Sequence, residues 1–330
     1  MPDSKSKQQD QTRKQHYIPK FYLDGFTSED DYLWLFDLKT GKKTRAHPKT
    51  VAWQKDFYRL KTVKVGANLY ENAFATLEKD AAKVIKKITE EETLPEPNSE
   101  EFTILMNFVA LMVVRTPKMW RSSDEASKEM FRMMIRGITR TEEIWKAQTR
   151  KWKKEGFDVN DFNREDMAEI ADEKKYNILV PKTEYLSMII DQLDVLISIL
   201  GHRKWFLACV CDERVNFVTS DNPVCLDWTV PMDSFYSPGF AHVNTIVNMP
   251  LTKRILMFGL FKSNKYLFRL KNRFKMGKII APFVNSSIIR HSDRFLFSSK
   301  DDFVWHADGK SIESWGELRR RITARERETG

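Results

Sequence analysis

The sequence predicts an α+β fold, in which a helical middle region packs against a mainly antiparallel sheet formed by the C-terminal half with N-terminal strands. Strand-like apolar runs occur soon after the polar start of the chain. Apolar residues then recur at three- and four-residue steps over about residues 69–201, which is helical spacing. Short apolar runs separated by turn residues return over about 204–298. These blocks differ from the regular alternation of a βαβ fold.

The N-terminal part is expected to hold two strands. Residues 32–38 mix aliphatic and aromatic side chains, which is typical of a strand, and Thr40 with Gly41 indicates a turn. The next strand is expected over 56–61.

The middle region is expected to be helical throughout. An amphipathic helix over 69–88 ends before the turn at 95–97, and Ser99 is a suitable N-cap for an apolar helix that runs to Thr116. The remaining segments are a charged helix or helix pair over 122–156 and an apolar helix that Thr183 caps and Gly201 ends.

The C-terminal region is expected to be mainly sheet. Four short apolar runs predict strands over 205–211, 216–219, 244–249 and 254–261. A helix over 277–292, a strand over 295–298 and a basic helix from Ser311 onward complete the expected elements.

Composition indicates a folded chain, because 42% of its 330 residues are hydrophobic and 12% are aromatic. Residues 1–15 are polar and are expected to form a disordered tail before a single domain over 16–330. This start lacks the apolar stretch of a secretory signal. The most apolar stretch, 102–114, is shorter than the roughly 20 residues that span a bilayer. We therefore expect a cytoplasmic protein without a membrane partner.

The three cysteines indicate neither a disulfide framework nor a structural zinc site, because they form no paired C-x-x-C elements. Cys209 and Cys211 are expected on one face of a strand, where reduced packing thiols are the common case.

Net charge is the first indication of a partner. A charge of +9 and a pI near 9.2 favour polyanions such as RNA or DNA. Residues 121–155 hold ten Lys or Arg against six acids, and five arginines gather between 319 and 327. Such runs also occur on ordinary solvated helix faces, so the charge alone leaves both interpretations open.

Three local motifs carry polar groups suited to a site. His16, in His16-Tyr17-Ile18-Pro19, suits a general acid or base, or simply lies beside aromatic anchors of the first segment. Asp221 and Asn222 stand at a strand end that Pro223 forces to turn, which is equally typical of a site and of an Asx turn. Arg115, after the apolar helix, would bind phosphate or the last carbonyls of its own helix.

Five motifs in order resemble the uncharacterised, mainly bacterial DUF4238 family over nearly the whole chain. They are the segment from His16 to Leu23, Arg115-Thr116-Pro117, the segment from Thr219 to Val224, Met249-Pro250-Leu251-Thr252, and Asn285 ahead of Arg294-Phe295-Leu296-Phe297. The resemblance implies a common fold and a shared group of polar residues, but no reaction.

The enzyme hypothesis places these polar residues in one pocket that cleaves a phosphodiester, in the manner of a nuclease-like effector. His16 would move protons, Arg115 would hold phosphate charge, Asp221 would orient the histidine or hold a metal, and Asn222 would donate hydrogen bonds. The substrate-binding candidates are Lys20, Ser220 and Asn285. Beyond Asp221 the metal ligands are unknown, and the need for a divalent cation stays open.

Two alternatives accompany this hypothesis. The same residues would suit a non-catalytic module that binds nucleic acid or protein, for example a sensor or effector in antiviral defence, and Trp145 and Trp152 are candidate exposed aromatics for it. In the second alternative, His16 and Asp221 form a buried structural pair. The oligomeric state has no heptad pattern to indicate it.

Overall fold

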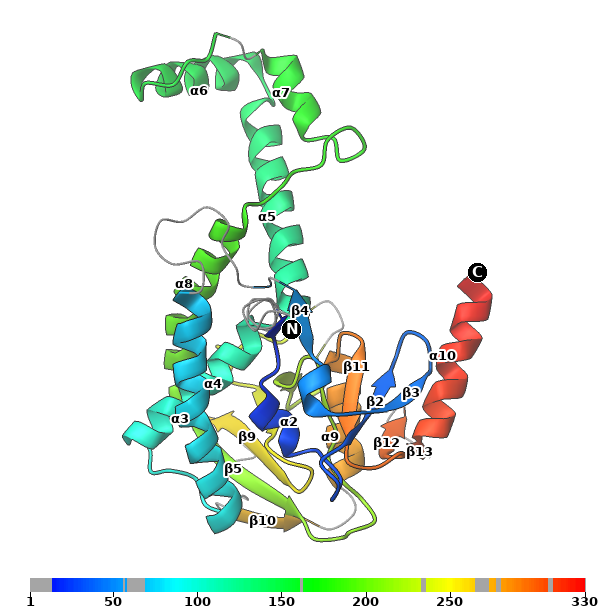
Figure 1. The fold of residues 1–330 in the computed structure, drawn as a ribbon. Coiled ribbons are helices and arrows are strands. Elements are labelled where there is room, and N and C mark those ends of the chain that lie inside the picture. Colours follow the sequence, from blue (N-terminus) through cyan, green and yellow to red (C-terminus); the bar gives the residue numbers. More distant parts are fainter. Residues whose placement is uncertain are drawn as a thin grey trace, which may run out of the picture. The chain divides into compact units, whose positions relative to one another are not determined.

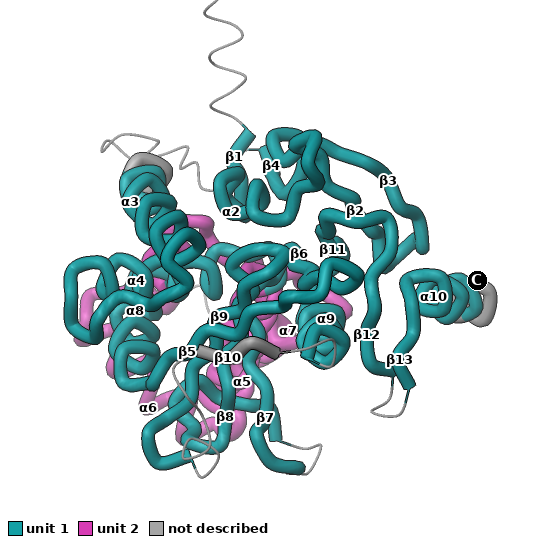
Figure 2. The backbone as a smooth tube through the Cα atoms, turned by 90° about the horizontal axis from the view of Figure 1, so that it is seen from below, with its two compact units in different colours: residues 1–118, 189–330 teal, residues 119–188 magenta. Residues whose placement is uncertain are grey.

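The computed structural model describes residues 14–55, 57, 69–160, 163–232, 236–264, 273–276, 280–307 and 311–329 (Figure 1). Contacts divide the chain into two compact units, one of residues 1–118 and 189–330 and a smaller one of residues 119–188 (Figure 2). The single domain over 16–330 stays a prediction beside this division. Most of the expected tail lies outside the described residues, but Lys14 and Gln15 belong to the first strand.

In the larger unit, a buried tyrosine helps to fix the N-terminal segment to the C-terminal half. Strand β1 (Lys14–His16) pairs with β4 (Trp53–Lys55), and the short helix α2 (Lys20–Asp24) follows β1. Tyr22 of α2 is 1% exposed, and its hydroxyl donates to the carbonyl of Pro250 at 2.6 Å and contacts Thr219 Oγ1 at 2.8 Å.

A four-stranded antiparallel sheet joins strands from both ends of the chain, as predicted. In order across the sheet, its strands are β3 (Lys43–Ala46), β2 (Leu33–Asp37), β11 (Phe295–Ser298) and β6 (Thr219–Ser220). The expected strands over 32–38 and 295–298 are confirmed by β2 and β11. Apart from Phe57, the strand expected over 56–61 lies outside the described residues. The 3₁₀ turn η1 (Pro48–Thr50) lies between β3 and β4.

A second, five-stranded sheet comes from the C-terminal half alone. In order, its strands are β10 (Arg273–Met276), β5 (Arg203–Val210), β9 (Ile255–Phe261), β8 (Thr245–Pro250) and β7 (Cys225–Trp228). Its pairs are antiparallel except for β10 with β5, which is parallel. The sequence interpretation did not identify β7 or β10, because both are four residues long and carry charged side chains that interrupt an apolar run.

The helical region largely follows the predicted pattern. Its helices are α3 (Leu69–Glu91), α4 (Glu100–Val114), α5 (Pro117–Ile138), α6 (Glu142–Lys154), α7 (Arg164–Ile170) and α8 (Lys182–Gly201). Ser99 caps α4 as expected, since its Oγ accepts a hydrogen bond from the Phe102 N–H at 3.1 Å. The charged segment over 122–156 belongs to a helix pair, and α7 was not predicted.

Two predicted helix starts were wrong. Thr183 does not cap α8, because the helix already begins at Lys182 and the Pro181 carbonyl accepts from the N–H of Glu184 at 3.1 Å. No helix begins at Ser311 either. Residues Ser311–Ser314 form β13, which pairs with β12 (Val304–Ala307), and the basic helix α10 starts at Trp315 and ends at Thr329.

One apolar core connects the two sheets with α9 (Ile280–His291), β12 and α10. The largest side chains of this core include Phe36, Phe206, Phe217, Phe258, Phe303 and Trp315. Helix α9 contacts both β6 of the four-stranded sheet and β7 of the five-stranded sheet. This arrangement positions the candidate site.

Within the described residues, no single helix is both long and apolar enough to cross a bilayer, and α4 with α5 passes that test only as a pair bent by 61°. The three cysteines are free thiols, of which Cys209 and Cys225 are buried and Cys211 is exposed.

The close approach of Trp205 to Gly259 gives a stability prediction. These residues are direct partners in the β5–β9 pair, and a Cβ atom at Gly259 would lie 2.9 Å from the Trp205 ring. Gly259→Ala is therefore expected to lower the free energy of unfolding by about 1–3 kcal/mol through overpacking, measured by chemical denaturation. Gly201→Ala is the control, because nothing lies within 4 Å of a Cβ there. Equal stability of both variants would contradict this role of Trp205.

Candidate functional site

Arg115 connects three N-terminal elements of the larger unit. It caps the end of α4, and only 2% of the residue is exposed. Its Nη1 donates to Glu78 Oε1 of α3 at 2.5 Å, and its Nη2 donates to the backbone carbonyl of His16. The Phe74 ring lies 5.9 Å from the guanidinium carbon. The guanidinium is thus engaged by the protein's own groups.

His16 is brought next to Arg115, but its imidazole has a different partner. The ring Nε2 lies 3.3 Å from the carbonyl oxygen of Lys49, and a carbonyl only accepts, so this nitrogen carries a proton. Burial lowers the pKa of His16, and the nearby Arg115 charge acts in the same direction, although the Lys49 hydrogen bond and Glu78 oppose it.

Asp221 lies at the end of β6 and is 2% exposed. Its Oδ1 accepts from the backbone N–H of Asp293, and its Oδ2 accepts from those of Arg294 and Phe295, each at 2.8 Å. Burial raises the pKa of Asp221 to about 6, although these three donors act in the opposite direction. Its carboxylate therefore holds the turn that leads into β11.

The other predicted residues also have defined contacts. The amide of Asn285, a fully buried residue, accepts from the N–H of Val218 at 3.0 Å and donates to two backbone carbonyls. Ser220 Oγ accepts from the N–H of Asn222, whose side-chain amide donates to the carbonyl of His291 at 2.8 Å. Lys20 forms an exposed ion pair with Asp24.

These contacts place the predicted residues in two groups. The first contains His16 and Arg115, and the second contains Ser220, Asp221 and Asn222 around the segment that follows α9. Among the described residues, no hydrogen bond or ion pair joins His16 to Asp221. The catalytic roles assigned to them stay predictions.

Next to the second group lies a polar cluster around Asp227 of β7. Its Oδ2 accepts from the Ser287 hydroxyl, and its Oδ1 accepts from His291 Nε2 at 3.1 Å and from Arg290 Nη2 at 3.3 Å. Asn248 Nδ2 lies 3.4 Å from Oδ2. Ser287 and His291 are four residues apart on α9, which places both on the helix face toward β7.

The contacts of Asp227 fix its ionisation. Burial raises its pKa, but the hydrogen bonds from His291 and Ser287, with the charges of His291 and Arg290, outweigh burial and lower the pKa to about 2. An ionised carboxylate only accepts, so His291 Nε2 must be the donor. In the neutral imidazole, Nδ1 is then a free base, and within the described residues it has no hydrogen-bond partner.

The cluster is partly open to solvent and has positive charge beside it. The side chains of Asp227 and His291 are 22% and 26% exposed, and that of Arg290 is 62% exposed. Lys118 Nζ donates to the His291 carbonyl at 2.9 Å. Burial raises the pKa of the Cys225 thiol, with Asp227 adding to this effect, so this thiol stays protonated and is a poor nucleophile.

Sequence reasoning missed Asp227, Ser287, Arg290 and His291. A usable signal was present, since Ser287 and His291 are spaced by four on the predicted helix over 277–292. Asp227 could not be found in this way because β7 was not predicted. In the part of the chain that the structure describes, no group of three or more His, Cys, Asp or Glu residues is arranged to hold a metal ion.

The basic segment over 121–155 belongs to a unit that is electrically balanced. Residues 119–188 hold fourteen Lys or Arg and fourteen Asp or Glu. Several of these charges pair, for example Lys128 with Asp124 at 2.6 Å. The interpretation of Trp145 as an exposed aromatic was wrong, because it is 7% exposed and packs edge-on against Trp152. Both residues belong to α6.

Comparison with known proteins adds one match. A family model described as "Protein of unknown function (DUF4238)" matches residues 14–302. No curated protein and no solved structure matches the chain.

The hydrogen bonds of Asp221 predict a structural cost for removing its charge. Asp221→Asn replaces one acceptor oxygen with an NH₂ group, which leaves at least one of the three partly buried hydrogen bonds without its acceptor. We expect a loss of about 1–3 kcal/mol in the free energy of unfolding, measured by chemical denaturation. Asp24→Asn, at an exposed position, serves as the control. Similar stability of both variants would show that the three bonds contribute little.

The lowered pKa of Asp227 predicts a loss of stability in acid. Its folded pKa of about 2 lies below the unfolded value of about 3.9, so its stabilising contribution is present above pH 4 and is lost as the pH falls through 2. The two values correspond to about 2–3 kcal/mol. Acid unfolding followed by circular dichroism should be less steep for Asp227→Asn than for the wild type. Identical pH dependence would contradict the assigned contacts.

Proposed function

The chain belongs to the DUF4238 family, whose function is unknown, and we propose that it cleaves phosphodiester bonds in nucleic acid with Asp227 and His291 as the proton-transfer pair. The observation that carries this proposal is the 3.1 Å contact between Asp227 Oδ1 and His291 Nε2 in a partly exposed cluster. A carboxylate that holds one ring nitrogen fixes the tautomer, orients the ring and stabilises the imidazolium that forms during proton transfer.

His291 is assigned the role of general base. Its Nδ1 takes the proton from the attacking oxygen, which is either water or a ribose 2′-hydroxyl, while this oxygen forms a bond to phosphorus. The bond from phosphorus to the leaving oxygen breaks, and the imidazolium returns the proton to that oxygen. Arg290 is exposed enough to pair with the phosphate and with the charge that develops on it.

Three features support His291 over the residues first predicted from the sequence. Its partner is a carboxylate, whereas the ring of His16 contacts a carbonyl. Asp221 already accepts three backbone N–H groups, so it is not available to orient a histidine. Asn222 keeps a role in the proposal, because its amide donates to the carbonyl of His291 and helps to position this residue.

Cleavage assays of purified variants test the proposal. Single-stranded RNA, single-stranded DNA and duplex DNA are incubated with the protein in EDTA, Mg²⁺ or Mn²⁺. We expect the wild type to cleave at least one of them, and His291→Ala to reduce the rate by about 10²–10⁴-fold. Asp227→Asn is expected to lower kcat more than it raises KM, because it disturbs the tautomer rather than binding.

His202→Ala is the matched control, since His202 is also near a helix end and its ring contacts the Ser198 carbonyl of its own helix rather than a carboxylate. Thermal unfolding verifies that each variant is folded, and His291→Asn provides a milder change should His291→Ala unfold. Cleavage at the wild-type rate by both His291 variants would contradict the proposal. Binding of nucleic acid by the wild type without any cleavage would favour the non-catalytic alternative.

A further inference from the structure

The β2–β3 hairpin carries aromatic and basic side chains on one face. Trp34 and Arg45 are direct cross-strand partners, as are Phe36 and Lys43, so all four side chains share that face. Phe36 is covered by Phe303 and Trp315. Toward the other end of the hairpin the face opens, since Tyr32 is 42% exposed and the side chain of Arg45 is 47% exposed.

Each cation on this face is close to an aromatic ring. The Arg45 guanidinium carbon lies 4.9 Å from the Tyr32 ring centroid, and Lys43 Nζ lies 5.3 Å from that of Trp34. Both cations also have acidic partners, Asp30 for Arg45 and Asp301 for Lys43. Aromatic rings of β2 and its start therefore lie beside ion-paired cations of β3, the edge strand of the four-stranded sheet.

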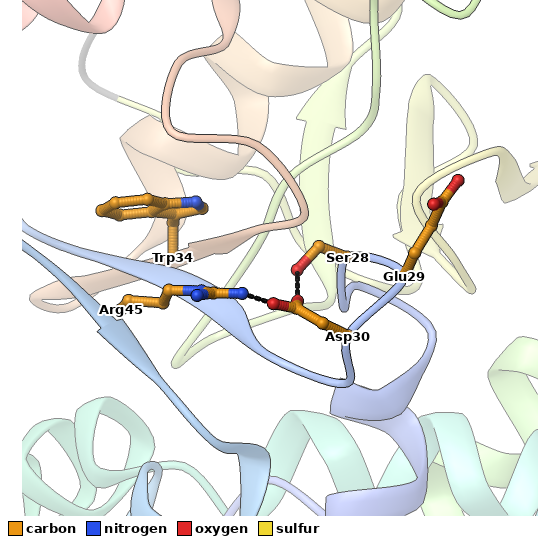
Figure 3. Close-up of a pocket in the computed structure, with 5 residues that line it drawn as sticks. All are labelled: Ser28, Glu29, Asp30, Trp34 and Arg45. Carbon is orange, nitrogen blue, oxygen red and sulfur yellow. Dashed lines mark hydrogen bonds and ion pairs between the residues drawn. The ribbon is translucent and has the colours of Figure 1, made fainter.

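A cavity of about 630 Å³ opens beside Trp34 and Arg45. It is lined by Ser28, Glu29, Asp30, Trp34 and Arg45. Figure 3 shows the Trp34 indole and the Arg45 guanidinium on the same side of the hairpin, with Asp30 facing Arg45 and Glu29 pointing away from this ion pair. The hollow is shallow and open, so a ligand would lie along its wall rather than be enclosed.

We propose that this pocket binds a nucleobase together with its adjoining phosphate, as single-stranded nucleic acid offers them. The Trp34 indole packs partly against the core and lines the pocket with the rest of its surface, on which a base can stack, and the guanidinium next to it pairs with the phosphate. A duplex is not suited to the pocket, because its bases are already stacked on one another. Without ligand, Arg45 is neutralised by Asp30, and the phosphate competes with this carboxylate.

The proposal does not depend on cleavage, and its test is carried out with the chain carrying His291→Ala so that no substrate is consumed. Binding of a short fluorescein-labelled oligodeoxythymidine or oligouridine is measured by fluorescence anisotropy. Trp34→Ala should raise Kd about tenfold, in keeping with 1–3 kcal/mol per stacked base, whereas Trp34→Phe should retain most of the affinity. Should Trp34→Ala not fold, the exposed positions Arg45 and Asp30 carry the test.

Two charge variants have opposite expected effects. Arg45→Ala weakens binding and reduces the slope of log K against log salt by about 0.7, the value for one contact to a single strand. Asp30→Asn removes the competing carboxylate and tightens binding. Trp53→Ala is the matched control, because Lys14 lies 4.6 Å from the Trp53 ring on the separate β1–β4 pair.

Unlabelled duplex and thymidine monophosphate are the competitors. Weak competition by both supports binding of a single strand, and efficient competition by the mononucleotide alone assigns the same base-and-phosphate chemistry to free nucleotides. The proposal is overturned by unchanged affinity in Trp34→Ala and Arg45→Ala, by an equal loss in Trp53→Ala, or by a duplex that competes as well as the single strand.

Discussion

The burial of one carboxylate, that of Asp221, is the constraint on which the central part of the larger unit depends. Three backbone N–H groups of residues 293–295 would be costly to bury without acceptors, and Asp221 satisfies all of them. The same turn carries Arg294, whose guanidinium makes a two-point contact with Asp37 of β2 at 3.0 and 2.7 Å. Consequently β6, β11 and β2 are fixed together where α9 ends, and His291 is held within reach of Asp227.

The sequence pattern predicted those helices and strands that are determined by the spacing of apolar residues within a short segment. The strand over 32–38 and the Ser99 cap follow from local signals, because apolar spacing and capping groups act within a few residues. The division into two sheets could not be predicted in this way. Whether β6 pairs with β11 or with β7 depends on contacts between residues far apart in the sequence, of which Asp221 with 293–295 is the clearest example.

At the candidate site, residue type alone does not tell whether a polar side chain has a structural or a catalytic role. Asp221, Asn222 and Asn285 were selected from the sequence as polar residues in short motifs, and all three are engaged in hydrogen bonds with the backbone. A buried polar residue that satisfies backbone groups and a polar residue that takes part in a reaction look alike in a sequence motif, so the sequence pattern does not distinguish the two roles. The charge run over 121–155 has the same ambiguity, since the unit that contains it has equal numbers of acids and bases.

The comparison of His16 with His291 indicates what makes a histidine suitable for proton transfer. Both rings are partly buried, and both use Nε2 as a donor. The Nε2 of His16 faces the Lys49 carbonyl, and burial opposes its imidazolium, with Arg115 acting in the same direction and Glu78 against it. The Nε2 of His291 faces the ionised Asp227 at 3.1 Å, so a proton taken up at Nδ1 gives an imidazolium whose charge this carboxylate stabilises. The group that hydrogen-bonds to Nε2, a carbonyl for His16 and a carboxylate for His291, therefore assigns the base in this proposal.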